Sequence, residues 1–330
     1  MEIAVLGAGS WGTTLANLLA GKGHSVSLWV RENELLQDMQ RTGVNSWFLP
    51  EFSLNPSLVM DDDLLKVLEG AQAVLVVVPC QFLRAVLRQG RSGFQEGQPV
   101  ICASKGVEIE QLKTMSEVVH DELGNLGVRY CVLSGPSFAR EVSAGLPTAV
   151  TLASADQAVR EELRPVLSTA TFRVYTSPDT RGVELGGAVK NVMALAAGIS
   201  DGLEFGHDAR AALITRGLAE MSRLGVAMGA RARTFMGLSG LGDLVLTSTG
   251  DLSRNRQVGK QLGQGKSRVQ IETEMRMVAE GVKTTKAVFQ LGSRLGVDLP
   301  ITDQVYQVLY KDKDPYLAVQ ELMERELKDE

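Results

Sequence analysis

The sequence predicts an α/β fold in which a doubly wound, mostly parallel sheet precedes an all-helical half. Short runs of β-branched and apolar residues alternate with helical patterns from residue 1 to about residue 176, and the strand-like runs stop after Pro178. Strands separated by helical segments are typical of parallel sheets that helices cover on both faces. A length of 330 residues also favours two domains over one. We therefore expect a Rossmann-like domain at residues 1–180 and an all-α domain at residues 181–330.

Seven runs in the first half are candidate strands. Several are continuously apolar instead of alternating, which is typical of strands buried on both faces. The candidates are Ile3–Leu6, Val26–Val30, Ala73–Val78, Val100–Ala103, Tyr130–Leu133, Thr148–Leu152 and Phe172–Tyr175.

In the second half, apolar residues recur at helical spacing over residues 214–224 and 288–295. Gly296 follows the second of these runs and is expected to end its helix, because glycine readily takes the left-handed conformation found just after helices. Thr302 and the pair Asp314-Pro315 carry the signature of helix starts.

Composition argues against several classes of protein. A net charge of −5 does not suit a general nucleic-acid binder, which needs a basic face to neutralise phosphates. No run approaches the roughly 18 apolar residues of a membrane span, and the first residues lack the basic segment of a signal peptide. The three cysteines form no CxxC pair, so a disulfide framework or zinc site is not expected. We expect a cytoplasmic protein that binds neither nucleic acid nor membrane and holds no metal.

Histidine is scarce, which bears on catalysis. His24 lies in a Gly-Lys-Gly-His turn, His120 in a helical run and His207 after a glycine, and none has a partner at metal-ligand spacing. A structural role suits each of them better. Proton transfer is therefore expected to fall to another residue type.

A glycine-rich turn, Gly-Ala-Gly-Ser-Trp-Gly at residues 7–12, follows the first predicted strand and opens the helical run Thr13–Ala20. In this context the pattern predicts a dinucleotide site. Gly7 permits the tight turn, Gly9 lets the backbone approach a pyrophosphate, and Gly12 lets helix and strand pack closely. The helix start then offers N–H groups and a positive dipole end to the anion. The alternative is a glycine-rich turn of some other α/β fold.

Arg31 lies at the end of the second predicted strand, where an NAD-selective enzyme usually has an acidic residue on the ribose 2′-hydroxyl. A guanidinium suits the 2′-phosphate of NADP instead. The sequence therefore favours NADPH, although Glu32 and Glu34 lie close by and leave NADH open.

The helical half contains a lysine, Lys190, within the small and apolar stretch Gly186–Ala197. Because burying an ammonium without partners is costly, this side chain either reaches the surface or serves a function. The functional interpretation is a lysine whose pKa is lowered by desolvation and by a neighbouring cation, which makes it a usable base near neutral pH. Lys105 is the candidate for that cation, since it lies at the C-terminal end of the fourth predicted strand, just after Ala103, at the sheet edge where ligands bind.

Three further groups are candidates for the substrate site. Gly135 and Ser137 follow the fifth predicted strand and offer a hydroxyl and turn N–H groups. Asp243 presents a carboxylate beside closely spaced glycines. Residues 253–256 (Ser-Arg-Asn-Arg) place a hydroxyl, a guanidinium and an amide ahead of a helical segment, which suits a phosphate. The alternative for this last cluster is a solvated helix cap.

Taken together, these motifs resemble those of the NAD(P)-dependent glycerol-3-phosphate dehydrogenases, in particular the bacterial biosynthetic type, over essentially the whole chain. Their joint occurrence in one order is far more specific than any single motif. They are Gly7–Gly12 with Ser10 and Trp11, Asn45 with Phe48-Leu49-Pro50, Ser104-Lys105-Gly106, Gly135–Ala139, Glu141, Gly187–Asn191, Gly240–Asp243, Ser253–Arg256 and Glu280-Gly281.

The resemblance implies NAD(P)H-dependent reduction of dihydroxyacetone phosphate to sn-glycerol 3-phosphate, its reverse, and a supply of this product for phospholipid synthesis. It implies that Lys190 accepts the proton when the C2 hydroxyl is oxidised and returns it in the reduction. Lys105 and Asp243 would orient the C2 oxygen and this lysine, as further catalytic residues. Arg254 and Asn255 would hold the phosphate.

The resemblance also implies a homodimer, and a helical domain like the C-terminal domain of 6-phosphogluconate dehydrogenase. The substrate-binding positions that it implies are Lys105, Gly135, Ser137, Lys190, Asp243, Ser253, Arg254 and Asn255. The cofactor positions that it implies are Ser10, Trp11, Arg31, Phe48, Lys105, Ala139, Arg254, Val278 and Glu280. The chain departs from the family at Cys80, where serine is common, and at Asp208, where asparagine is common.

Two other functions are alternatives. A dehydrogenase or ketoreductase of the β-hydroxyacid type would share the two-domain plan, but its substrate carries a carboxylate and the phosphate-type cluster at residues 253–256 argues against it. A non-catalytic NADPH-binding sensor would keep the glycine loop but would not need Lys190, Asp243 and Arg254 together.

Overall fold

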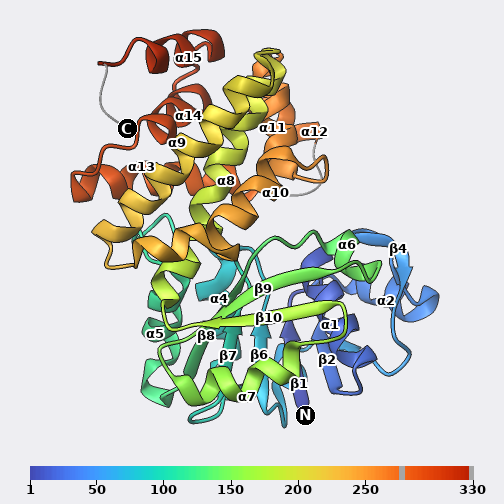
Figure 1. The fold of residues 1–330 in the computed structure, drawn as a ribbon. Coiled ribbons are helices and arrows are strands. Elements are labelled where there is room, and N and C mark those ends of the chain that lie inside the picture. The colour runs from blue at the N-terminus through green and yellow to red at the C-terminus, as the bar shows by residue number, and fades with distance from the viewer. Residues whose placement is uncertain (275–278, 327–330) are drawn as a thin grey trace. The chain divides into compact units, whose positions relative to one another are not determined.

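The computed structural model describes residues 1–274 and 279–326, drawn as the coloured ribbon of Figure 1. The chain forms two compact units. The first unit comprises Met1–Lys105 and Thr114–Val183, and the second comprises Gly106–Lys113 and Glu184–Glu330. The second unit thus includes a short segment from the first half of the sequence. Val107 anchors that segment, because its side chain is fully buried in the core of the second unit.

In its described residues the first unit contains an eight-stranded sheet with the order β10-β9-β8-β7-β6-β1-β2-β5. Neighbouring strands are parallel except β8 and β9, which are antiparallel. The strands are β1 Glu2–Leu6, β2 Ser25–Trp29, β5 Val59–Asp61, β6 Ala73–Val76, β7 Pro99–Cys102, β8 Arg129–Ser134, β9 Thr148–Ala153 and β10 Phe172–Ser177. The predicted mostly parallel sheet is confirmed, and each predicted strand ends within two residues of its expected bounds.

Residues of β1 alternate between the two faces of this sheet. Ile3 and Val5 belong to the core on one face, and Ala4 and Leu6 belong to the core on the other. Both faces are buried, which explains the continuously apolar strand. Helices α1 Ser10–Gly21, α2 Asn33–Thr42, α6 Ala139–Ser143 and α7 Gln157–Leu167 contribute to the first core, and α3 Leu64–Leu68, α4 Leu83–Gly90 and α5 Met115–Leu123 contribute to the second.

Three short strands were not predicted. β5 lies at the edge of the sheet and is at least partly exposed along its length, so it lacks an apolar run. β3 Val44–Asn45 and β4 Leu49–Ser53 pair as an antiparallel hairpin. Most of β4 is exposed and it contains Pro50, so it does not show the pattern of a core strand.

The second unit consists of helices wherever the structure describes regular elements, as predicted, and they are coloured from yellow-green to red in Figure 1. They pack around a core that includes Val189, Met193, Leu224 and Phe235. None of the described helices is both long and apolar enough to cross a membrane. The α-helices are α8 Thr180–Gly202, which begins in the first unit, α9 Gly206–Ala227, α10 Asp243–Thr249, α11 Arg254–Gly263, α12 Arg268–Glu274, α13 Glu280–Leu295, α14 Pro300–Tyr310 and α15 Pro315–Met323.

Two of the three predicted helix boundaries are confirmed. Gly296 follows α13 with a φ of 65°, and the Asp314 side chain accepts hydrogen bonds from two N–H groups at the start of α15. The prediction for Thr302 is wrong, because α14 begins at Pro300 and Thr302 lies inside its first turn. The hydroxyl and N–H of Thr302 donate to the carboxylate of Glu220 instead, at 3.1 and 3.2 Å.

Glu220 joins α9 to the start of α14. Its side chain is buried, and it also accepts from the N–H of Ile301. A carboxylate here satisfies N–H groups of the first turn that have no partner within the helix. Burial raises the pKa of Glu220 to about 7, although these hydrogen bonds act in the opposite direction.

Replacement of Glu220 by glutamine should change how stability depends on pH. Because the folded-state pKa of about 7 exceeds the ordinary 4.5, the folded protein binds this proton more tightly than the unfolded chain. The resulting stabilisation of the folded protein is complete at a pH below the ordinary pKa of 4.5, and it is lost as the pH rises through the folded-state pKa of about 7. The free energy of unfolding of the wild type should fall relative to Glu220→Gln by up to about 3 kcal/mol between about pH 5 and about pH 8. Urea unfolding of both proteins measures this, and parallel pH profiles would contradict it.

Candidate active site

The glycine-rich turn connects β1 to α1, the context that a dinucleotide loop requires. Gly7 has a φ of 114°, and a Cβ there would lie 2.9 Å from the carbonyl oxygen of Val77. A Cβ on Gly12 would collide with the carbonyl oxygen of Gly7, so helix and turn are packed backbone to backbone. A Cβ on Gly9 would meet no atom within 4 Å. The loop is therefore closed on its inner side and open at Gly9.

The open side of this loop is suited to an anion. Gly9 is the N-cap of α1, and the N–H of Thr13 is bonded to its carbonyl at 2.9 Å. The N–H groups of the preceding turn therefore lie at the positive end of the helix dipole. Together with the space at Gly9, they fit the pyrophosphate of a dinucleotide.

Four further proposed cofactor positions of the first unit lie on α1, in the β3–β4 hairpin and at the start of α6. Ser10 and Trp11 are the first residues of α1, and the ring of Trp11 lies 6.4 Å from that of Phe172. Phe48 lies in the hairpin between β3 and β4 and packs against the core. Ala139 begins α6, and its carbonyl accepts a hydrogen bond of 3.3 Å from a threonine of α1.

Arg31 lies just beyond the carboxyl end of β2, as predicted from the sequence. Its side chain is 64% exposed and donates from Nε and Nη2 to one oxygen of Glu32, at 3.0 and 2.6 Å. A guanidinium is thus present where a ribose substituent would be recognised, with a carboxylate already beside it.

Lys105, Gly135 and Ser137 come together at the carboxyl ends of β7 and β8, which are adjacent parallel strands. The ammonium of Lys105 donates to the carbonyl of Gly135 at 3.2 Å, and the hydroxyl of Ser137 donates to the same carbonyl at 3.0 Å. Two donors are therefore gathered at one point on the ligand-binding edge of the sheet.

Lys190 is buried in the second unit rather than at the surface. Its Nζ donates to Oδ1 of Asp243 at 2.6 Å and to Oγ1 of Thr247 at 2.7 Å, and the two ionic side chains are 8% and 2% exposed. The Thr247 hydroxyl in turn donates to Asp243 at 3.2 Å. The charge of Asp243 favours the ammonium form of Lys190, whereas burial opposes it. The cation expected beside Lys190, Lys105, belongs to the first unit, and its effect on Lys190 stays a prediction.

Sequence reasoning missed Thr247. It lies four residues after Asp243 on α10, so both side chains project from the same helix face. The spacing of four residues could have identified Thr247. On a helix, a hydroxyl four positions after a carboxylate can bind the same partner as that carboxylate, here Lys190.

A close approach of two backbones brings Asp243 to Lys190. Gly186, one turn before Lys190 on α8, has no side chain where a Cβ would lie 2.5 Å from the carbonyl oxygen of Ser239. Ser239 belongs to the π-helical turn Leu238–Gly242 that leads directly into α10. This contact fixes the start of α10 against α8.

The cluster at residues 253–256 forms the start of α11. Ser253 caps the helix, since its Oγ accepts from the N–H of Arg256 at 3.2 Å, and Arg254 is exposed in the first turn. The structure is consistent with both interpretations of this cluster, the helix cap and the phosphate site, because a capping serine and an exposed guanidinium occur side by side.

Asn255 connects three helices of the second unit. Its Nδ2 donates to Oδ1 of Asn191 on α8 at 3.0 Å, and its Oδ1 accepts from the N–H of Gly281 on α13 at 2.9 Å. Asn191 follows Lys190 directly, and Glu280 is the first residue of α13. Val278, the remaining proposed cofactor position, lies outside the described residues.

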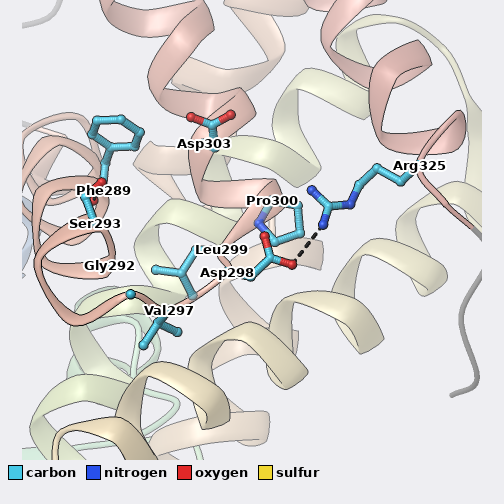
Figure 2. Close-up of a pocket in the computed structure, with 10 residues that line it drawn as sticks. Phe289, Gly292, Ser293, Val297, Asp298, Leu299, Pro300, Asp303 and Arg325 are labelled. Atoms are coloured by element: carbon cyan, nitrogen blue, oxygen red, sulfur yellow. Dashed lines mark hydrogen bonds and ion pairs between the residues drawn. The ribbon is translucent and has the colours of Figure 1, made fainter.

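A pocket elsewhere in the second unit contains none of the predicted site residues. This cavity of about 380 Å³ lies at the end of α13 and the start of α14, and Phe289, Val297 and Leu299 are among its lining residues. Figure 2 shows them together with the ion pair between Asp298 and Arg325. Among residues 1–274 and 279–326, no group of His, Cys, Asp or Glu side chains is placed to hold a metal ion.

Two family models match this chain. The model described as NAD-dependent glycerol-3-phosphate dehydrogenase N-terminus matches residues 2–160, and the one described as NAD-dependent glycerol-3-phosphate dehydrogenase C-terminus matches residues 179–320. The two matches together cover nearly all of the sequence.

Curated relatives and a solved structure carry the same description. The chain is 59% identical to the glycerol-3-phosphate dehydrogenase (NAD(P)+) of Maridesulfovibrio salexigens and 56% identical to that of Solidesulfovibrio magneticus, over the full length of each. The crystal structure of glycerol-3-phosphate dehydrogenase from Coxiella burnetii is similar with a TM-score of 0.95 and 44% identity, covering 98% of this chain and 99% of that one.

Substitution of Gly186 by alanine should destabilise the protein, because the added Cβ would lie 2.5 Å from a backbone oxygen that cannot move away without shifting α10. We expect a loss of about 2 kcal/mol or more in the free energy of unfolding. Gly21→Ala is the matched control. Gly21 lies in a different helix, α1, and a Cβ there would meet only the side chain of Asn55, at 3.9 Å. The control should be neutral or stabilising by up to about 1 kcal/mol. Equal stability of the two variants in urea unfolding would refute the close contact.

Proposed function

Since the chain belongs to the NAD-dependent glycerol-3-phosphate dehydrogenase family, we propose that it interconverts dihydroxyacetone phosphate and sn-glycerol 3-phosphate, with NADPH as the preferred cofactor. One observation carries the proposal. Lys190 is a buried ammonium held by Asp243 and Thr247, in the unit that also contains the exposed guanidinium of Arg254 at a helix start. An acid for the carbonyl oxygen and a cation for the phosphate are what this reduction needs.

A nicotinamide dinucleotide, whose pyrophosphate the Gly7–Gly12 loop would hold, would supply the hydride chemistry for C2 of the ketone. The protein supplies the proton. The ammonium of Lys190 donates one proton to the C2 oxygen, so that ketone, hydride and proton together give the alcohol. In the oxidation the neutral amine of Lys190 accepts that proton.

Asp243 and Thr247 position Lys190 for this transfer. The carboxylate favours the charged ammonium, which is the form that donates in the reduction. Both partners also fix the direction of the lysine side chain.

Arg254 and Asn255 bind the phosphate in this proposal. The guanidinium forms charge-assisted hydrogen bonds with phosphate oxygens, and the N–H groups at the start of α11 add to them. Asn255 uses one N–H on Asn191 and retains its second for the ligand. In the first unit, the family resemblance assigns Lys105, Gly135 and Ser137 to the same substrate. Ser253 and the cofactor position Glu280 are assigned on the same basis.

We further propose, from the resemblance alone, that the enzyme is a cytoplasmic homodimer that supplies glycerol 3-phosphate for phospholipid synthesis. Residues 1–180 would form the NAD(P)-binding domain and residues 181–330 the substrate domain. A nicotinamide cofactor follows from family membership, and the glycine loop fits its pyrophosphate.

Replacement of Lys190 by alanine should lower kcat with dihydroxyacetone phosphate by about a thousandfold, because the proton donor is removed. The dissociation constant of NADPH should change less than about threefold. Lys260→Ala, a change at an exposed lysine of α11, is the control and should keep wild-type turnover. Near-normal turnover of Lys190→Ala would refute the role of this lysine.

The same assay distinguishes the alternative functions. The wild type should reduce dihydroxyacetone phosphate faster than 2-keto and 3-keto acids. Faster turnover of the keto acids would contradict the substrate assignment, and binding of NADPH without any turnover would favour a sensor.

Cofactor preference should depend on Arg31 and Glu32 in opposite directions. Arg31→Ala should lower the ratio of kcat/KM for NADPH over NADH by about tenfold, because the guanidinium no longer binds the 2′-phosphate. Glu32→Gln should raise the ratio, because the carboxylate that occupies Arg31 and repels the phosphate is removed. If the ratio of kcat/KM for NADPH over NADH is unchanged in both variants, Arg31 and Glu32 do not determine cofactor preference.

A further inference from the structure

Asn45 is a buried polar residue of the first unit to which the proposed mechanism gives no role. It ends β3, and its side chain is fully buried. Its Nδ2 donates to the carbonyl of Ala8 at 2.9 Å and to Oγ1 of Thr13 at 2.8 Å, and its Oδ1 accepts from the N–H of Phe48 at 3.1 Å. Because an N–H can only donate, the bond from Phe48 fixes which side of the carboxamide is the oxygen.

These partners are parts of the nucleotide loop. Ala8 is the middle residue of the Gly7–Gly9 turn, and Thr13 follows Gly12 in the first turns of α1. The hydroxyl of Thr13 also donates to the carbonyl of Ala8, at 3.2 Å, so this oxygen has two donors. A single buried carboxamide thus holds the loop, the helix and the hairpin of Phe48 together.

The bond to Ala8 has a directional consequence. The carbonyl of Ala8 and the N–H of Gly9 belong to one trans peptide group, in which they point in opposite directions. When Asn45 holds this carbonyl inward, the Gly9 N–H is directed to the outer side of the loop. That side is open, because a Cβ on Gly9 would meet no atom within 4 Å.

We propose that Asn45 is a positioning residue of the cofactor site, which orients the Ala8–Gly9 peptide so that the Gly9 N–H faces the pyrophosphate. This inference rests on the proposed function, since it assumes a bound nicotinamide dinucleotide. Without the bond, only the Thr13 hydroxyl holds the Ala8 carbonyl, and the Gly9 N–H is less firmly oriented toward the ligand. This role of Asn45 differs from a purely structural one, because its loss would lower the affinity for the cofactor and not only the stability of the fold.

The test measures NADPH binding to the purified protein without substrate, by calorimetry, together with the thermal midpoint of each variant. Asn45→Asp replaces both amide hydrogens with a carboxylate that cannot donate to Ala8, and should raise the dissociation constant about tenfold. Thr13→Val removes the second donor to the same carbonyl with little change of shape. It should raise the dissociation constant about threefold, and Thr13→Ser should restore it.

Asn17→Ala is the matched control. Asn17 also lies on α1 and ties it to the hairpin, since its Nδ2 donates to the carbonyl of Ser53 and its Oδ1 accepts from the N–H of Asn55. Its loss should lower the thermal midpoint but change the NADPH dissociation constant less than about twofold.

The outcomes separate this inference from the proposed function. If the wild type fails to bind NADPH and NADH, the proposed function itself fails. If the wild type binds and Asn45→Asp changes the dissociation constant no more than the control, Asn45 has only a structural role and the inference is overturned. If Asn45→Asp does not fold, Thr13→Val decides, because an unchanged dissociation constant there means that weakening the hold on the Ala8 carbonyl does not affect cofactor binding, and the inference is overturned.

Discussion

An ammonium and a carboxylate that are both almost fully buried depend on each other in the second unit. Neither Lys190 nor Asp243 could stay charged there alone, since an isolated buried ion costs several kcal/mol. Their contact requires α8 to approach the start of α10 closely, which the absence of a side chain at Gly186 permits. The packing of these helices and the placement of the proposed proton donor therefore have the same physical basis.

The sign of that neighbouring charge alters the chemical interpretation of Lys190. A neighbouring cation was expected, whereas the contact that the structure shows is with an anion, Asp243, whose charge favours the ammonium while burial opposes it. An ammonium is the form that donates a proton to a ketone oxygen, so in the proposed reduction Lys190 acts in its charged form. The oxidation needs the neutral amine, which the same carboxylate disfavours.

Much of the fold could be predicted because its signals are local. Strands such as β1 are buried on both faces, so they appear as apolar runs, and the glycine pattern at residues 7–12 lies within one turn. Contacts between distant residues leave no such signal. The bond from Lys190 to Thr247 spans 57 positions and that from Asn45 to Ala8 spans 37. Thr302 shows the same limit, since a helix-start residue type was recognised but its partner, Glu220, lies 82 positions away.

The candidate site was predictable to a similar extent. Residue types with a required spacing, such as the glycines and the Ser-Arg-Asn cluster, were found before their geometry was known. Asn45 was recognised only as part of a motif, because its function depends on where its carboxamide points. A residue that positions other groups is recognised by its contacts in three dimensions, and a single sequence does not show those contacts.

The central claim is that the ammonium of Lys190 provides the proton for the C2 oxygen. The most direct measurement is chemical rescue of Lys190→Ala by small primary amines, following NADPH oxidation with dihydroxyacetone phosphate. If the claim holds, methylammonium restores turnover in proportion to its concentration, and amines of similar size but different pKa restore it to different extents. If no amine raises the rate of Lys190→Ala above its background while the wild type stays unaffected, the proton comes from another group and the assignment of Lys190 is wrong.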